Sequence, residues 1–319
     1  MTSKTALVFG WNGQDGSLIT KSLLKKKFKV IGLSRKQLTS KSNQIAQDIE
    51  KEIKIEVGDI ANFEFVEKSI QKNMPDEIYN LAAQSSVGMS FSYPIKTFEI
   101  IANGTLNILE AARKLNYCGR IFFAGSSEIF GETEKAATIE HNQKPISPYA
   151  NAKLASFNLV KLYRDLYKIN CVTGILFNHE SPLRDNRFVT HKIVSEAIQC
   201  SIDKSRKVEM GNLKISRDWG WAEEYVEAMQ SITRAKKMKD QIICTGKLTK
   251  IESFIEKTFQ KLNLNWRDHI VSSNRLFRER DIIKSFGNPN ALKKDLNWKA
   301  HIFLDEIIEK LIEAKIRIN

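Results

Sequence analysis

The stretch TALVFGWNGQDGS, residues 5–17, carries the strongest indication of the fold. An apolar, β-branched run leads directly into Gly10, Gly13 and Gly16, and an amphipathic helical pattern then covers Asp15–Lys26. Glycine allows a tight turn close to a pyrophosphate, and a helix N-terminus supplies free amides and a positive dipole. Because a strand pattern precedes the glycines and a helix pattern follows them, the stretch predicts a dinucleotide-binding loop rather than a glycine-rich turn without a ligand.

The same alternation continues along the first half of the chain. Short β-branched or aromatic runs predict strands at Thr5–Phe9, Lys29–Leu33, Ile53–Val57, Glu77–Leu81, Arg120–Ala124 and Asn170–Leu176. Longer amphipathic patterns predict helices at Asp15–Lys26, Phe63–Lys72, Ile95–Lys114 and Pro148–Tyr167. Strands that alternate with helices form βαβ units around a parallel sheet.

After Phe177 the rhythm becomes irregular. A helix is predicted at Thr190–Ile202, then a loop, a helix at Ala222–Ala235, a strand at Gln241–Thr245 and three further helical pieces. We therefore expect an α/β fold, in which a Rossmann-type doubly wound parallel sheet carries a smaller, discontinuous substrate-binding cap.

Composition limits the class of protein. The chain has 319 residues, of which 42% are hydrophobic and 27% charged, as in globular proteins without long disorder. Its apolar runs are too short to cross a bilayer and it begins without a signal segment, so we expect a cytoplasmic protein with no membrane partner. The four cysteines are far apart in the sequence and suggest neither a zinc site nor a disulfide framework.

The net charge of +13 raises the question of a nucleic-acid partner. The lysine runs, however, lie on otherwise amphipathic helical stretches, where solvated helix faces are the simpler interpretation. No recognition motif and no basic stripe interleaved with aromatic residues is present, so we expect no nucleic-acid partner.

The end of the second predicted strand indicates which dinucleotide binds. An acidic residue there would bind the adenosine ribose of NAD, but the chain has Ser34, Arg35 and Lys36, whose cations can pair with a 2′-phosphate. NADP is therefore the expected cofactor, the alternative being that Arg35 is only a surface arginine. Two later loops would complete the pocket, and their candidate residues are Asp59, Ile60, Leu81, Ala82, Ala83, Gln84 and Ser85.

A Tyr–Lys pair indicates proton chemistry. Tyr149 and Lys153 are four residues apart and share one face of a predicted helix. To act as a base near neutrality, a tyrosine needs its pKa of about 10 lowered by about 3, which corresponds to roughly 4 kcal/mol. A nearby ammonium and a cationic nicotinamide ring would both stabilise the phenolate. Such a pair also occurs by chance in many helices, and the dinucleotide loop upstream is what favours the catalytic interpretation.

A hydroxyl and a carboxylate follow the fifth predicted strand, in the run Gly125-Ser126-Ser127-Glu128. Ligands bind beyond the carboxyl ends of parallel strands, so these side chains should face the nicotinamide. The hydroxyl can bind a sugar hydroxyl. The carboxylate can remove a carbon-bound proton next to a ketone and protonate a leaving hydroxyl, although in isolation it would be taken for a solvated loop acid.

Together these residues resemble the extended short-chain dehydrogenase/reductases and, among them, the GDP-mannose 4,6-dehydratase family. The resemblance covers nearly the whole chain. Its markers are 13–17 (GQDGS), 80–85 (NLAAQS), Ser127-Glu128, 147–150 (SPYA), 176–182 (LFNHESP), 188–190 (FVT), Lys192-Ile193 and 217–220 (RDWG). The last parts, Asn178–Pro182 and Arg217–Gly220, are specific to this dehydratase and its nearest relatives.

The resemblance assigns roles residue by residue. It implies that Tyr149 is the base, that Lys153 activates it and contacts the cofactor, that Glu128 transfers protons, and that Ser126 stands where the family has threonine. The implied cofactor contacts are Gly10, Gly13, Gln14, Asp15, Gly16, Arg35, Asp59, Ile60, Leu81, Ala82, Ala83, Gln84, Ser85, Tyr149, Lys153, His179 and Arg184. The implied substrate contacts are Ser85, Ser127, Asn178, Val189, Lys192, Arg217, Arg278 and Asp281. No metal is implied.

The resemblance also implies an activity and a division of the chain. The expected reaction is NADP-dependent dehydration of GDP-mannose to a GDP-4-keto-6-deoxy sugar by internal oxidation, elimination of water and reduction. The NADP-binding domain would comprise residues 1–176 and 213–246, and the nucleotide-sugar-binding domain residues 177–212 and 247–319. The family pairs its long helices between subunits, so a homodimer or homotetramer is expected.

Four departures from the family keep alternatives open. Gly125 replaces a small hydroxyl residue, Leu183 an arginine, Asp185 a glycine and Glu224 an aspartate. The family's arginine-rich loop after the second strand is altered, which leaves dimer and tetramer undecided. A GDP-heptose 4,6-dehydratase, a 4-reductase or a 4-epimerase could use the same scaffold, although the last two need no elimination acid such as Glu128. A non-catalytic NADP-binding protein is a fourth alternative.

Overall fold

The computed structural model describes residues 3–39, 43–277 and 280–318. Its centre is a seven-stranded sheet in the order β10-β6-β5-β4-β1-β2-β3, with every neighbouring pair parallel. The strands are β1 (Thr5–Phe9), β2 (Lys29–Ser34), β3 (Lys54–Val57), β4 (Glu77–Asn80), β5 (Arg120–Ser126), β6 (Cys171–Leu176) and β10 (Gln241–Ile243). The order reverses between β1 and β4, which is where doubly wound sheets bind their ligands. The predicted Rossmann-type sheet is therefore confirmed.

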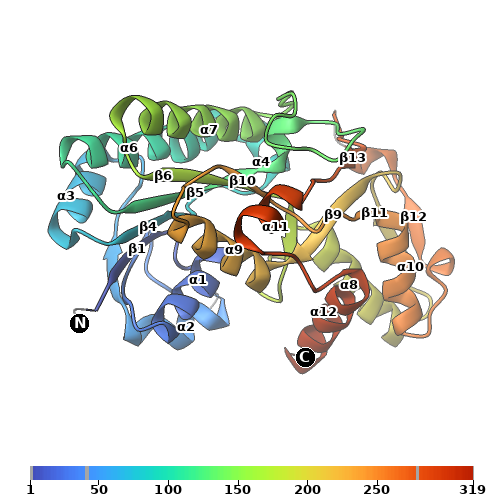
Figure 1. The fold of residues 1–319 in the computed structure, drawn as a ribbon. Helices are drawn as coiled ribbons and strands as arrows, with labels where there is room; N and C mark the ends of the chain where they lie inside the picture. The colour runs from blue at the N-terminus through green and yellow to red at the C-terminus, as the bar shows by residue number, and fades with distance from the viewer. Residues whose placement is uncertain (1–2, 40–42, 278–279, 319) are drawn as a thin grey trace.

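Helices cover both faces of this sheet (Figure 1). One face carries α1 (Gln14–Lys25), α2 (Gln44–Ile49), α9 (Ala222–Arg234) and α11 (Asn290–Leu296). The other carries α3 (Phe63–Asn73), α4 (Val87–Ser92), α5 (Pro94–Phe98), α6 (Gly104–Lys114) and α7 (Pro148–Tyr167). Alternate residues of β1 serve the two cores, since Ala6 and Val8 pack on the α1 side and Leu7 and Phe9 on the α6 side.

The single helix predicted at Ile95–Lys114 is interrupted. Five residues, Glu99–Asn103, form a π-helical turn between α5 and α6. The carbonyl of Ile101 accepts hydrogen bonds from the hydroxyls of Thr105 at 2.7 Å and Ser156 at 3.0 Å. Side chains that compete for a helix carbonyl in this way favour a local change of register, a feature frequent near functional sites.

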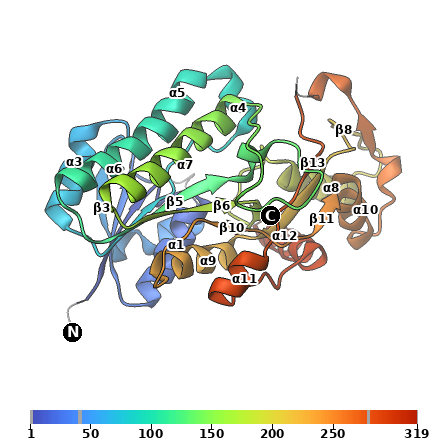
Figure 2. The same cartoon turned by 45° about the horizontal axis from the view of Figure 1, so that its top comes forward.

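The second lobe lies beyond the carboxyl ends of the strands (Figure 2). A four-stranded sheet runs β11-β9-β13, with β7 also paired to β9, and β8 pairs with β12. Its elements are β7 (Asn178–Glu180), α8 (Val189–Ile202), β8 (Val208–Met210), β9 (Ser216–Trp221), β11 (Leu248–Lys250), α10 (Ile251–Lys261), β12 (Ile270–Ser272), β13 (Lys284–Ser285) and α12 (Leu304–Ile318). Among the described residues, no helix combines the length and apolar character needed to cross a bilayer.

The prediction of a loop between Ile202 and Ala222 is wrong in one respect, because this segment contains the strands β8 and β9. All six residues of β9 are buried, yet Arg217 and Asp218 interrupt its apolar pattern. Its partners β7, β11 and β13 are distant in the sequence, so local periodicity carries no sign of the strand.

Candidate active site

The glycine loop after β1 is shaped by contacts that exclude side chains. Gly10 has a φ of +78°, and a Cβ there would lie 2.9 Å from the backbone of Ala82. A Cβ on Gly16 would lie 2.0 Å from the carbonyl oxygen of Gly10. Gly13 precedes α1 and has no side chain to cap it, so the first amides of the helix face the loop. This cradle of backbone N–H groups fits a dinucleotide pyrophosphate.

The other predicted cofactor residues surround this loop at the carboxyl ends of neighbouring strands. The Leu81 amide donates to the Phe9 carbonyl, which places the Leu81–Ser85 segment beside the glycine loop. Gln84 closes that segment on Ser86, accepting from its amide at 2.6 Å. Beyond β3, Asp59 accepts from the Ala61 amide at 3.0 Å and Ile60 is buried. Exposed Arg35 follows β2 directly.

Ser126, Glu128 and Tyr149 come together between β5 and α7. Ser126 ends β5, Glu128 lies in the 3-10 turn Ser127–Phe130 that follows, and Tyr149 is the second residue of α7. Burial raises the pKa of Tyr149 to about 12, and the Glu128 charge adds to this, against the lowering effects of a hydrogen bond with Ser126 and the Arg184 charge. The hydroxyl, the carboxylate and the phenol therefore share one partly desolvated site.

Lys153 lies on the same helix as Tyr149, and burial is the largest influence on the pKa of both groups. Its Nζ donates to the Ala124 carbonyl at 2.7 Å and lies 5.8 Å from the centroid of the Tyr149 ring. Burial lowers the pKa of Lys153 to about 8. In the protein alone, the desolvation of Tyr149 thus outweighs the influence of the ammonium.

The departure at Gly125 has a steric cause. A Cβ there would lie 2.7 Å from Cγ2 of Thr173 on the neighbouring strand β6. A serine or threonine at 125 would require Thr173 to move.

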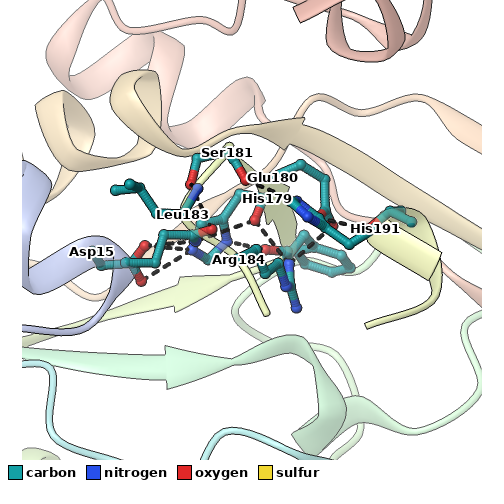
Figure 3. A network of polar contacts seen from close by, with 10 residues as sticks. Asp15, His179, Glu180, Ser181, Leu183, Arg184 and His191 are labelled. Carbon is teal, nitrogen blue, oxygen red and sulfur yellow. Dashed lines mark hydrogen bonds and ion pairs between the residues drawn. The ribbon is translucent and has the colours of Figure 1, made fainter. Parts of the chain in front are cut away.

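His179 lies beside Asp15, which stands in the first turn of α1, directly after the glycine loop (Figure 3). Its Nε2 is 3.0 Å from an Asp15 carboxylate oxygen, its Nδ1 is 2.7 Å from the Phe177 carbonyl, and its ring stacks on Tyr225. Burial acts to raise the pKa of Asp15, but His179 outweighs it and the net shift is downward. Burial likewise acts to lower the pKa of His179, but Asp15 raises it overall. The two groups form a buried hydrogen-bonded pair, in which each shifts the pKa of the other toward its charged form.

Arg184 follows β7 and is held by residues on either side of it in the sequence. Its Nη1 donates to the His179 carbonyl at 2.8 Å and to Oε1 of Glu180 at 2.9 Å, and its guanidinium lies over the Phe188 ring. The Arg184 charge contributes to lowering the pKa of Asp15 and opposes the rise in that of Tyr149. The charge of Arg184 therefore affects the pKa of a residue beside the glycine loop and that of the tyrosine on α7.

The predicted substrate residues come from the second lobe, apart from Ser85 and Ser127. Asn178 begins β7 and lies next to β9, where buried Arg217 donates to the Ser216 carbonyl at 2.9 Å. Val189 begins α8, and the Nζ of Lys192, on the same helix, donates to the Glu209 carbonyl at 2.7 Å. Half-buried Asp281 precedes β13, a neighbour of β9. The predicted Arg278 lies outside the described residues.

Several functional candidates were not singled out from the sequence. Glu180, Ser181 and Thr190 connect the cofactor and substrate halves, and Ser181 donates to Gln14 at 2.8 Å. Glu180 and Ser181 belong to the quoted 176–182 stretch, which was the available signal, but nothing local showed what they contact. Across the described ranges, no group of three or more His, Cys, Asp or Glu could hold a metal.

Comparisons with known proteins show which family and which folds the chain resembles. The family model described as GDP-mannose 4,6 dehydratase matches residues 7–311. GDP-mannose 4,6 dehydratase 1 of Arabidopsis thaliana is 35% identical, over 99% of this chain and 90% of its own length. The crystal structure of a dTDP-glucose 4,6-dehydratase from Bacillus anthracis in complex with NAD is similar, with a TM-score of 0.85 at 18% identity, covering 99% and 97% of the two chains. RMD from Pseudomonas aeruginosa, complexed with NADPH, has a TM-score of 0.82 at 20% identity, covering 99% and 100%.

Proposed function

The chain belongs to the GDP-mannose 4,6-dehydratase family, and we propose that the residues gathered between its two lobes carry out that reaction with NADP as the resident cofactor. The protein is a hydro-lyase that uses a nicotinamide cofactor to dehydrate GDP-mannose. The observation that carries the site assignment is the meeting of Ser126, Glu128 and Tyr149 at the end of β5. Incubation with GDP-mannose should give a product lighter by one water, and an unchanged mass would contradict the activity.

Tyr149 and Glu128 divide the proton transfers in this proposal. Tyr149, hydrogen-bonded to Ser126, would act as a phenolate stabilised by the Lys153 ammonium and by the positive charge of a bound oxidised nicotinamide, and in that form it takes the proton of the sugar 4-hydroxyl as that carbon becomes a ketone. The ketone acidifies the proton on carbon 5, which Glu128 removes, and the hydroxyl on carbon 6 leaves with a proton as water. When carbon 6 is reduced, a proton returns to carbon 5 and Tyr149 remains beside the keto oxygen. A bound nicotinamide supplies reversible hydride storage between carbon 4 and carbon 6, so no net reductant is consumed.

Polar and positively charged side chains of the second lobe would bind the nucleotide diphosphate of the substrate. We assign Asn178, Lys192 and Arg217 to the nucleotide diphosphate and Asp281 to a ribose. Arg217 supports this assignment because it is buried on β9, where its guanidinium is oriented by the carbonyls of Ser216 and Ile283. An arginine fixed in this way presents a planar set of donors that suits phosphate oxygens.

The preference for NADP can be tested at the end of β2. Arg35 is exposed there and can pair with a 2′-phosphate, which NAD lacks. We expect Arg35→Ala to weaken NADPH binding by about 10-fold or more, the loss of one charge-assisted hydrogen bond, and to leave NADH binding unchanged. Titration of nicotinamide fluorescence measures both. Equal losses for the two cofactors, or no loss, would refute the assignment.

The two lobes suggest a division of labour close to the predicted domains. We propose that residues 3–176 and 222–246 bind the cofactor and that 177–221 and 247–318 bind the nucleotide sugar. We propose 222 in place of the expected 213 for this boundary, which is supported by the pairing of β9 with β7 and β11 in the second sheet and by the packing of α9 on α1. We also propose a cytoplasmic enzyme, consistent with four free cysteines, and cell fractionation checks it.

We further propose that the protein forms at least a dimer through α5 and α7. Ile95 is 75% exposed on α5, and Leu162 and Leu166 are 51% and 59% exposed on α7. Large apolar side chains gathered on one face mark an interaction surface. Light scattering at micromolar concentration should give the mass of two or more chains, and a monomer mass would rule out the proposal.

A further inference from the structure

Glu180 is a buried carboxylate that the proposed reaction does not use. It ends β7, directly after His179, and is 1% exposed. Its two oxygens accept from two different side chains, one in the loop after β7 and one on α8 (Figure 3). Oε1 accepts from Arg184 at 2.9 Å, and Oε2 accepts from the hydroxyl of Thr190 at 2.7 Å.

The two partners belong to different halves of the site. Arg184 donates to the carbonyl of His179 at 2.8 Å, and the ring of His179 in turn contacts Asp15 at the start of α1, directly after the glycine loop. Thr190 is 1% exposed and is the second residue of α8, the helix that also carries Val189 and Lys192. A single carboxylate thus connects the cofactor half to the substrate-binding helix.

Burial makes this arrangement sensitive to each donor. A buried carboxylate is costly unless its oxygens are hydrogen-bonded, and losing one donor exposes that cost in full. Without the Thr190 hydroxyl, Oε2 would lose its donor and the carboxylate would reorient. That change would weaken the ion pair that orients Arg184 and leave the guanidinium held by its hydrogen bond to the His179 carbonyl at 2.8 Å.

We propose that Glu180 is a positioning residue that orients Arg184 toward the cofactor, and that Thr190 on α8 sets the orientation of this carboxylate. The inference rests on the proposed function, in which Arg184 contacts NADP. Its consequence is specific: a hydroxyl on the substrate-binding helix controls the affinity for the cofactor more than the affinity for the nucleotide.

The test compares binding of NADPH, followed by its fluorescence, with binding of GDP, followed by calorimetry. Thr190→Val keeps the shape of the side chain and removes the donor; it should weaken NADPH about 5-fold or more and leave GDP within about 2-fold. Thr190→Ser keeps the hydroxyl and should bind both ligands as the wild type does. Ser195→Ala, on the same helix but bonded to Asn186, is the matched control and should change neither affinity.

Two outcomes would overturn the inference. If Thr190→Val weakens GDP binding as much as NADPH binding, the hydroxyl only stabilises α8. If the variant changes neither affinity, the orientation of the Glu180 carboxylate does not depend on the hydroxyl. Should Thr190→Val fail to fold, Glu180→Gln, which keeps the shape but loses the charge, must show the same selective loss of NADPH affinity. Arg184→Ala tests the premise that Arg184 contacts the cofactor. If this variant binds NADPH with unchanged affinity, the assignment of Arg184 to the cofactor is wrong. If Arg184→Ala loses NADPH affinity but Thr190→Val does not, only the positioning role of Glu180 and Thr190 is refuted.

Discussion

The Glu128→Gln variant is expected to form the dehydrated product 10²–10⁴-fold more slowly than the wild type, because it loses the group that removes the carbon 5 proton. Glutamine keeps the shape of the side chain in the turn after β5, where Ser126 accepts from the backbone amide of residue 128 at 3.3 Å. Oxidation at carbon 4 depends on Tyr149 and should continue. Addition of GDP-mannose should therefore produce a persistent absorbance of reduced nicotinamide. The bound sugar should be a 4-keto hexose that still carries its hydroxyl on carbon 6.

Tyr149→Phe is the matched comparison for this result. It removes the phenol that takes the first proton, so both the absorbance change and the dehydrated product should be absent. Glu128→Gln and Tyr149→Phe are then distinguished by absorbance rather than by rate alone. If Glu128→Gln yields dehydrated product at the wild-type rate, Glu128 is an ordinary loop acid and the assigned elimination step is wrong.

The second large effect is expected from Lys153→Met, which should abolish activity and yet stabilise the fold. Burial lowers the pKa of Lys153 from 10.5 to about 8. This difference corresponds to roughly 3 kcal/mol of destabilisation while the group is charged. Loss of the hydrogen bond to the Ala124 carbonyl offsets about 1 kcal/mol of the gain. At pH 7 the melting temperature should rise by about 2–8 °C.

The pH dependence of this effect has a definite sign. Between about pH 8 and 10.5 the unfolded chain binds more protons at Lys153 than the folded protein does, so this group makes stability rise with pH across that window. The advantage of Lys153→Met should be complete below about pH 8 and vanish above 10.5. Chemical denaturation at several pH values measures it, with exposed Lys161→Met on the same helix as control. A destabilised Lys153→Met at pH 7 would contradict the account.

Much of the cofactor half could be predicted from local sequence. The strand, glycine and helix patterns of residues 5–26 correspond to β1, the loop and α1, because each depends on residues adjacent in the chain. The first six predicted strands and the helix of Tyr149 and Lys153 are confirmed for the same reason. The Tyr–Lys spacing likewise predicted the shared helix face, but not the pKa of Tyr149, which depends on burial among Ser126, Glu128 and Arg184.

Only the tertiary structure decided the features that depend on distant partners. β9 is a strand because β7, β11 and β13 satisfy its backbone, and no periodicity within Ser216–Trp221 could show that. The π-helical turn at Glu99–Asn103 involves the hydroxyl of Ser156, which comes from α7. The carboxylate of Glu180, which ends β7, accepts hydrogen bonds from both Arg184 and Thr190 on α8, a meeting that the folded loop between them makes possible. Local sequence determines which elements form, whereas burial and long-range hydrogen bonds, which require the packed chain, determine which side chains meet and how they ionise.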